Sequence, residues 1–415
     1  MDEDDAGDGR GPRRRTVLGA AGAVGAAGVA AAGAGGAAAD PGHGAGAPTG
    51  GTDDHHGAFG TVGEYGGGFD PHGFLRTFNT GHDGQSNLTQ SVAREDGRRV
   101  REFTIRATDT AIEIAPGVSF AAWAFHGQVP GPTLRVTEGD LVRVHFVNGS
   151  AHAHTIHPHL RNLNPRMDGI PQNGPGVLET GESFTYEWLA QPAGVHLYHC
   201  HSLPLTAHIH RGLSGALVVD PDPERVAQRP AEYVLFHPSQ ITPELRDDLV
   251  ARARSLNGSD PAYADDGDAQ ELVMVMNGFD TNFDGENEVY AVNTRAFAYG
   301  VGSTDGNGEW APGETVRPIR ISRDRPVRVY LVNAIEFDPI NSFHTHSQFF
   351  DYYDHGTSLV PTHETVDTVM QCQAQRGIVE LDYSAHEPGL YMFHAHQSEF
   401  AELGWMSFFE VVDDA

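Results

Sequence analysis

The 415-residue chain contains no lysine, so its 27 basic residues are all arginines, set against 56 aspartates and glutamates. The formal net charge of -29 excludes nucleic acid and anionic lipid as favourable partners, because both would be repelled. Such a charge fits a protein kept soluble at high salt, and also an acidic secreted protein from an ordinary habitat. The chain has only two cysteines, Cys200 and Cys372. Beyond the first forty residues it has no apolar run long enough to span a bilayer.

The N-terminal residues 1–39 are typical of a twin-arginine export signal. Arg13-Arg14-Arg15 precede Thr16-Val17-Leu18, and a long Ala/Gly stretch ends in Ala37-Ala38-Ala39, a small-residue cleavage pattern. The stretch is poor in Leu, Ile and Phe, which favours export over a membrane anchor. We therefore expect a secreted, periplasmic or cell-surface protein whose mature chain has no membrane span. Residues 40–99 are rich in Gly, Asp and His and predict a flexible lead-in.

From residue 100 onward, short alternating runs punctuated by Gly, Pro and Asn predict β-strands of a sandwich. Examples are Val100–Ile105, Leu134–Phe146 and Ser183–Trp188. The second half repeats the first: the run that starts at Val142 recurs at Val327, and the segment ending His199-Cys200-His201 recurs as His394-Ala395-His396. This predicts an all-β chain of two tandem sandwiches, residues 100–222 and 276–415. A polar linker, 223–275, would join them and carry a short helix at Pro243–Ser255.

The 24 histidines are clustered, and clustered histidine is typical of metal binding. Four His-x-His pairs stand at matching points of the repeat: His157/His159, His199/His201, His344/His346 and His394/His396. Residues two apart in a strand point to the same face, so each pair aims two imidazoles at one place. If the sandwiches meet face to face, eight imidazoles converge. Imidazole without carboxylate suits copper, zinc, iron or nickel.

A second metal site is indicated around Cys200. One thiolate and two imidazoles form the trigonal set of a blue copper centre, which assigns Cys200, His154 and His208 as ligands. Leu213 would stand near the axial position, and because leucine cannot ligate, the reduction potential should be raised. The spacing of His152 and His210 fits this site less well. The second repeat has Asn341 and Ala395 at the equivalents of His154 and Cys200, so it should lack blue copper.

Taken together, these motifs resemble those of the multicopper oxidases, and in particular the two-domain, laccase-like subgroup with blue copper in the first domain alone. The resemblance covers residues 100–412 and implies cupredoxin-like Greek-key sandwiches. It also implies a homotrimer with a three-copper cluster between neighbouring subunits, and about four coppers per chain: one type 1, one type 2 and two type 3. The type 1 ligands would be the three named above, with type 2 copper on His157 and His344. Type 3 copper would be held by His159, His199, His201, His346, His394 and His396.

The resemblance implies an oxidoreductase that takes single electrons from phenolic or metal-ion reductants and uses four of them to reduce O2 to water. Cys200 lies directly between two cluster ligands, which would give electrons a covalent route of one residue. Asp168 and Glu399 are candidate proton relays because they lie near the motifs, although their position alone favours the interpretation as ordinary surface carboxylates.

Two other functions and one additional metal site stay open. A copper-containing nitrite reductase shares the two-domain plan, and Gly212-Leu213-Ser214-Gly215 resembles one of its segments; its catalytic copper, however, needs only three histidines. A non-catalytic copper-binding or electron-transfer protein would need only the blue site. Residues 280–285, Asp-Thr-Asn-Phe-Asp-Gly, resemble the start of a calcium loop, but Ala291 stands where a bidentate glutamate is expected. Cys372 is interpreted as a buried small residue of a strand.

Overall fold

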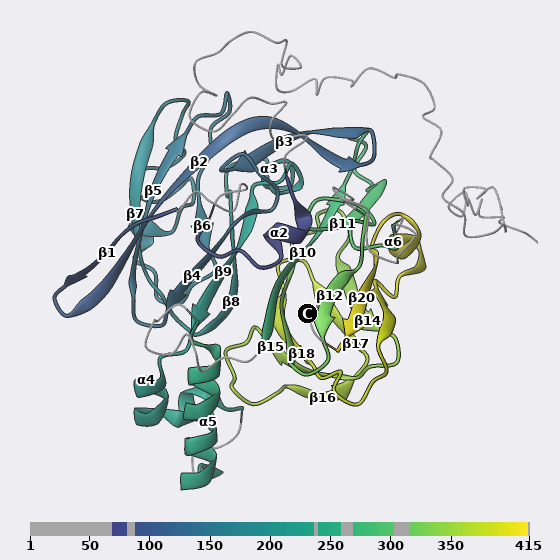
Figure 1. Ribbon diagram of the computed structural model, residues 1–415. Coiled ribbons are helices and arrows are strands. Elements are labelled where there is room, and N and C mark those ends of the chain that lie inside the picture. Colours follow the sequence, from purple (N-terminus) through teal and green to yellow (C-terminus); the bar gives the residue numbers. More distant parts are fainter. Residues whose placement is uncertain (1–68, 81–87, 236–239, 259–268, 303–315, 414–415) are drawn as a thin grey trace, which may run out of the picture.

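The computed structural model describes residues 69–80, 88–235, 240–258, 269–302 and 316–413 (Figure 1). Within these ranges the chain is built almost entirely of β-strands, arranged as two sandwiches side by side. No helix in the described ranges has the length and apolar character needed to cross a membrane. The predicted export signal, residues 1–39, lies outside the described residues.

The first sandwich consists of two sheets. One sheet has the order β1-β2-β5-β7, with β3 also paired to β2, and the other has the order β4-β9-β8-β6. The strands are β1 (Thr89–Glu95), β2 (Arg98–Ala115), β3 (Val118–Phe125), β4 (Gly131–Thr137), β5 (Leu141–Asn148), β6 (His157–Pro158), β7 (Ser183–Leu189), β8 (Gly194–His199) and β9 (Ser214–Asp220). Along β5 every second side chain is buried, as expected for a strand with one face on a core. Phe103, Val144, Trp188 and Leu217 are part of that core.

The second sandwich repeats this plan. Its sheets have the orders β11-β10-β13-β18-β15-β16 and β12-β20-β19-β14-β17. The strands are β10 (Gln270–Phe279), β11 (Val289–Val292), β12 (Ile319–Ser322), β13 (Val327–Asn333), β14 (Ile340–Thr345), β15 (Phe350–Asp354), β16 (His363–Val366), β17 (Thr368–Cys372), β18 (Arg376–Leu381), β19 (Gly389–His394) and β20 (Met406–Val412). The parallel pair β2/β5 corresponds to β10/β13, and β4/β9 corresponds to β12/β20. The predicted tandem all-β repeat is therefore confirmed.

The two sandwiches share a buried apolar layer. Val195 and Val218 of the first sandwich pack in one cluster with Val275, Tyr330 and Ile378 of the second. A backbone hydrogen bond from Val195 N to His355 O, 2.9 Å long, also crosses the joint. Because apolar packing of this kind resists sliding, the sandwiches hold a defined relative orientation.

Short helices fill the connections. They are α2 (Pro71–Phe74), η2 (Pro165–Met167), α3 (Leu205–His210), α4 (Pro223–Gln228), η3 (Pro230–Tyr233), α5 (Pro243–Leu256) and α6 (Ser398–Glu402). The helix predicted at Pro243–Ser255 is confirmed as α5. Its N-cap is Thr242, whose side chain accepts a hydrogen bond from the Leu245 N–H, and Pro243 follows at the first helical position.

The structure corrects several expected boundaries. The run Leu134–Phe146 is not one strand but parts of β4 and β5, which lie in different sheets. The turn between them contains Gly139 with a φ of 92°, a conformation that favours glycine. The predicted linker 223–275 ends early because β10 begins at Gln270, and the lead-in 40–99 already contains α2 and β1.

Cys372 is exposed, not buried, so that interpretation was wrong. The burial of β17 alternates, and Cys372 falls on its outward face.

Candidate functional site

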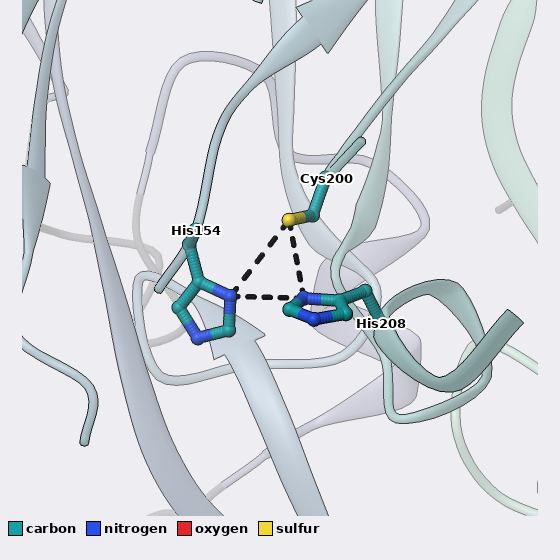
Figure 2. A group of neighbouring side chains, drawn as sticks. All are labelled: His154, Cys200 and His208. Atoms are coloured by element: carbon teal, nitrogen blue, oxygen red, sulfur yellow. Dashed lines mark hydrogen bonds between the residues drawn. The ribbon is translucent and has the colours of Figure 1, made fainter. Parts of the chain in front are cut away.

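The predicted blue-copper residues come together in the first sandwich. Cys200 directly follows β8, His208 lies in α3, and His154 forms an isolated bridge with Leu178. Figure 2 shows the three side chains pointing toward one another. The Cys200 Sγ lies 3.3 Å from His208 Nδ1 and 3.7 Å from His154 Nδ1, and the two Nδ1 atoms are 3.1 Å apart. All three residues are buried.

These separations fit one metal ion. Donor atoms 3.1 to 3.7 Å from one another can all bond an ion at lengths of about 2.0 to 2.3 Å. Burial, together with His208 and His152, lowers the pKa of His154 well below its usual value, so this imidazole is neutral and able to ligate. Burial raises the pKa of the Cys200 thiol, while the backbone N–H groups of Thr155 and Ser202 oppose that rise. A cation in this position would stabilise the thiolate, and a thiolate with two imidazoles suits copper.

Local hydrogen bonds fix this geometry. The Cys200 N–H donates to the Leu213 carbonyl, and the Leu213 N–H donates to the His208 carbonyl, so the three residues hold one another in register. Leu213 is fully buried and apolar, as expected for a residue beside the axial position. The two spare histidines have other neighbours: His152 packs against Trp123, and His210 Nε2 accepts the N–H of Asp280.

A first quartet of histidines lies next to this site: His157, His159, His199 and His201. His157 on β6 stands opposite His199 on β8, and the Nε2 atoms of His159 and His199 are 3.0 Å apart. The Nδ1–H of His157 donates to the Asp168 carbonyl at 2.6 Å, and that of His199 donates to the Cys200 carbonyl at 2.8 Å. Backbone acceptors on Nδ1 leave Nε2 for a metal, which is the usual arrangement around metal-bound histidine. Burial lowers the pKa of His159 to about 2 and that of His199 to about 3.

A second quartet repeats the arrangement in the second sandwich: His344, His346, His394 and His396. His344 on β14 stands opposite His394 on β19. The Nε2 atoms of His346 and His394 are again 3.0 Å apart. The Nδ1–H of His344 donates to the Asp367 carbonyl, and that of His394 donates to the Ala395 carbonyl. Four predicted imidazoles thus gather twice, by the same hydrogen-bond pattern.

The two quartets do not meet within one chain. Among the described residues, ring contacts join these histidines only inside each quartet. Figure 1 shows β6 and β14 well apart on their respective sandwiches. The expectation that eight imidazoles converge is therefore not met inside a single chain. His346 and His396 are exposed, so the second quartet faces outward.

The described part of the second sandwich does not repeat the cysteine site. Asn341, at the position of His154, is fully buried, and its Nδ2 lies 3.3 Å from the Met276 sulfur. Ala395, at the position of Cys200, is also fully buried. At these two positions the second sandwich thus has an amide and a methyl group where the first has an imidazole and a thiolate.

Of the two carboxylates predicted as proton relays, the structure places only one beside a predicted copper ligand. The Asp168 Oδ1 lies 3.4 Å from His157 Nδ1. Glu399 is exposed on α6 and acts on Tyr290, whose pKa is raised by burial and by carboxylates including Glu399. Within the described ranges Glu399 makes no hydrogen bond or ion pair with a predicted ligand.

Sequence reasoning missed one residue at the first quartet. The Arg376 Nη1, on β18 of the second sandwich, lies 3.3 Å from His159 Nδ1. The same side chain donates to the Val195 carbonyl. No local pattern could have indicated it, because the contact depends on how the two sandwiches dock.

The loop that resembles a calcium site does bring its carboxylates together, but these carboxylates already accept hydrogen bonds from the loop itself. Asp280, Asp284 and Glu288 have oxygens within 4.8 Å of one another. Asp280 accepts the N–H groups of Asp284 and Gly285, while Glu288 accepts from Thr281 and Asn282. Ala291 is buried in β11, so position twelve supplies no ligand.

Comparison with known proteins points to one family. Two family models, both described as multicopper oxidase, match residues 106–224 and 280–415. A solved structure of a multicopper oxidase is 40% identical to this chain and covers 84% of it and 99% of the other chain, with a TM-score of 0.64. A copper nitrite reductase structure from Nitrosomonas europaea is 22% identical, covers 76% of this chain and 95% of its own, and has a TM-score of 0.56; it shows the fold alone.

Curated relatives match over shorter segments. A multicopper oxidase of Talaromyces pinophilus is 38% identical over 160 residues, which is 38% of this chain and 24% of that protein. A copper-containing nitrite reductase of Neisseria gonorrhoeae is 32% identical over 127 residues, 30% of each chain. The matched segments span about a quarter to a third of the length of these curated relatives.

Proposed function

Because the chain belongs to the multicopper oxidase family, we propose that it is a laccase-like oxidase, coupling one-electron oxidation of phenolic or metal-ion reductants to four-electron reduction of O2 to water. One observation supports this most directly. Cys200, whose sulfur faces His154 and His208, lies between His199 and His201 in the chain. Three consecutive residues therefore connect the cysteine site with the first histidine quartet.

We propose the following copper ligands. Type 1 copper would be held by Cys200, His154 and His208 beside Leu213, and type 2 copper by His157 and His344. Type 3 copper would be held by His159, His199, His201, His346, His394 and His396. Bound copper would supply reversible one-electron chemistry at these positions. The protein positions the imidazoles through backbone acceptors on their Nδ1 atoms and keeps water from the buried cysteine site.

We propose that the three-copper cluster forms where the second quartet of one chain meets the first quartet of a neighbour, in a homotrimer. The separation of the quartets within a chain supports this, since neither alone offers enough imidazoles for three coppers. Three exposed apolar side chains lie on or next to strands of the second sandwich, which carries the second quartet. Phe349, Met370 and Leu390 are 55%, 65% and 48% exposed. Large apolar side chains are seldom exposed together without a partner surface.

Protons are needed for water to form, and Asp168 is the better proposed relay. Its carboxylate lies beside His157 and is partly exposed to solvent, so it joins the quartet to the outside. Glu399, without such a contact, is the weaker of the two predicted relays. Export through the twin-arginine route stays a prediction from residues 1–39.

Copper-containing nitrite reduction is the second candidate, because curated relatives with that name match part of the chain. The two quartets together contain more histidines than the three that the catalytic copper of such an enzyme needs. A non-catalytic copper-binding or electron-transfer protein would leave both quartets unused.

The test is a copper count on the metal-loaded protein, combined with oxygen uptake and nitrite consumption. We expect about four coppers per chain, with O2 consumed when a phenol or a ferrous salt is added. About two coppers per chain with nitrite reduction and no O2 uptake would favour the reductase. Copper binding without either activity would favour the electron-transfer protein.

A further inference from the structure

A cavity of about 930 Å³ opens on the side of the molecule where α2 lies against the second sandwich. Figure 1 shows α2 beside β10, between the two sandwiches. The cavity takes residues from the α2 segment, from β4 and from the β10 and β12 region. They are Asp70, His72, Gly73, Arg76, Phe78, Arg135, Ala269, Gln270, Glu271, Arg317, Pro318, Arg320 and Arg325. Its volume lies within the range of sites for small organic ligands.

The charge of this lining is opposite to that of the chain. Five arginines and two carboxylates line the cavity, which leaves three positive charges in excess, whereas the chain as a whole carries -29. A concave surface of one sign concentrates the electrostatic field and attracts ions of the other sign. In a chain with 27 basic residues among 415, five arginines around one cavity are a marked local concentration of positive charge.

Not all five arginines are available to a ligand. Arg135 is buried and forms ion pairs with Asp220 and Glu271, so it belongs to the wall of the cavity. Arg76, Arg317 and Arg320 form no ion pair with any carboxylate in the described part of the chain. Arg76 donates to the backbone carbonyl of Arg320, which holds the α2 segment and β12 together at the cavity.

Two of these arginines, Arg76 and Arg317, lie close enough to repel each other. Desolvation by the surrounding protein lowers the pKa of Arg76, and Arg317 lowers it further. Burial lowers the pKa of His72 to about 4, again with Arg317 contributing, so this imidazole adds no charge at neutral pH. Like charges held close without a counter-ion are unfavourable, and a bound anion would relieve that repulsion.

We propose that this cavity binds a compact multivalent oxyanion, an oligophosphate or a polycarboxylate, through Arg76, Arg317 and Arg320. Guanidinium forks make paired, charge-assisted hydrogen bonds to phosphate and carboxylate oxygens, which suits several arginines to one anion of high charge. The anion would bridge the α2 segment, which carries Arg76, and the second sandwich, which carries the other two. The cavity shares no residue with the copper ligands, so this site does not depend on the proposed oxidase activity.

The test is calorimetric titration of the full chain at fixed ionic strength, with tripolyphosphate and citrate as probes and acetate as the monovalent control. We expect one multivalent anion per chain and much weaker binding of acetate. The double variant Arg317→Gln/Arg320→Gln should weaken binding at least about tenfold, because each charge-assisted hydrogen bond contributes substantially. Binding by tripolyphosphate alone would identify phosphate as the recognised group, and binding by citrate alone would identify carboxylate.

The matched control is Arg229→Gln/Arg246→Gln, which removes the same charge from exposed positions outside the cavity. This control should change the dissociation constant by less than about twofold, since distant surface charges are screened. Equal weakening by both double variants, or no binding of either multivalent anion, would overturn the proposal. If the double variant is less heat-stable than the parent protein without any multivalent anion, the single variant Arg320→Gln replaces it in the titration. Arg320 is an exposed residue of β12, so this single change should leave the fold intact.

Discussion

The sulfur of Cys200 lies 3.3 Å from Nδ1 of His208, in a site where both residues are buried. The contact brings together a residue at the end of β8 and a residue of α3. The arrangement fits a shared cation, and it makes Cys200 the residue whose replacement separates the proposed blue site from the histidine quartets.

We expect Cys200→Ser to abolish the intense blue absorption and the oxygen uptake together, while copper falls by about one ion per chain. Serine keeps the volume but supplies no thiolate, and both quartets remain. Absorption spectra, copper analysis and an oxygen electrode measure this. Cys372→Ser is the matched control, because Cys372 is exposed on β17 and should leave all three unchanged. A blue, active Cys200→Ser protein would disprove the ligand assignment.

The proposed subunit assembly can be tested independently of the blue copper site. We expect Met370→Glu/Leu390→Glu to dissociate the proposed trimer, because burying a carboxylate at a subunit contact is costly. Oxygen uptake and the copper of the quartets should fall, while the blue absorption persists. Light scattering and copper analysis test this, with Leu235→Glu, also at an exposed apolar position, as control. Full activity in a monomeric variant would show that one chain suffices.

The local pattern of the sequence predicted the quartets because strand geometry places residues i and i+2 on one face. Each quartet also uses one strand pairing, His157 with His199 and His344 with His394, at matching points of the internal repeat. The tandem sandwiches were predictable for the same reason: alternation and the repeat are local signals.

The features that the sequence did not predict depend on tertiary contacts, which no local sequence pattern indicates. Arg376 reaches His159 only because two sandwiches share a core layer. The turn at Gly139 interrupts an otherwise continuous alternation, so two strands looked like one. Cys372 was predicted to be buried because its run is strand-like, but alternation does not say which face is turned to solvent.

Proton delivery can be tested at Asp168. We expect Asp168→Asn to lower the turnover of oxygen reduction at least about tenfold, since a positioned proton-transfer group typically contributes that much or more. Copper content should not change, because His157 is held by the backbone carbonyl of residue 168. Steady-state kinetics and copper analysis measure the two effects. Glu399→Gln is the matched control, and an equal loss of turnover in both variants would contradict the assignment of Asp168.

Acid stability should depend on Glu380, which joins α5 to the second sandwich. Burial alone would raise the pKa of Glu380, but Arg252 and Arg328 outweigh it and lower the pKa to about 2. A carboxylate with a lowered pKa in the folded state stabilises the protein above its unfolded-state pKa. That stability is lost as the pH falls from about 4.5 toward 2.

We therefore expect Glu380→Gln to reduce the free energy of unfolding by about 2 to 3 kcal/mol at neutral pH. The difference from the parent protein should shrink as the pH falls through that window, because the parent then loses the same ion pairs. Urea unfolding at several pH values measures this. Glu364→Gln removes an exposed carboxylate and should change stability by less than about 0.5 kcal/mol. A Glu380→Gln deficit that is independent of pH would mean that packing, and not charge, accounts for the loss.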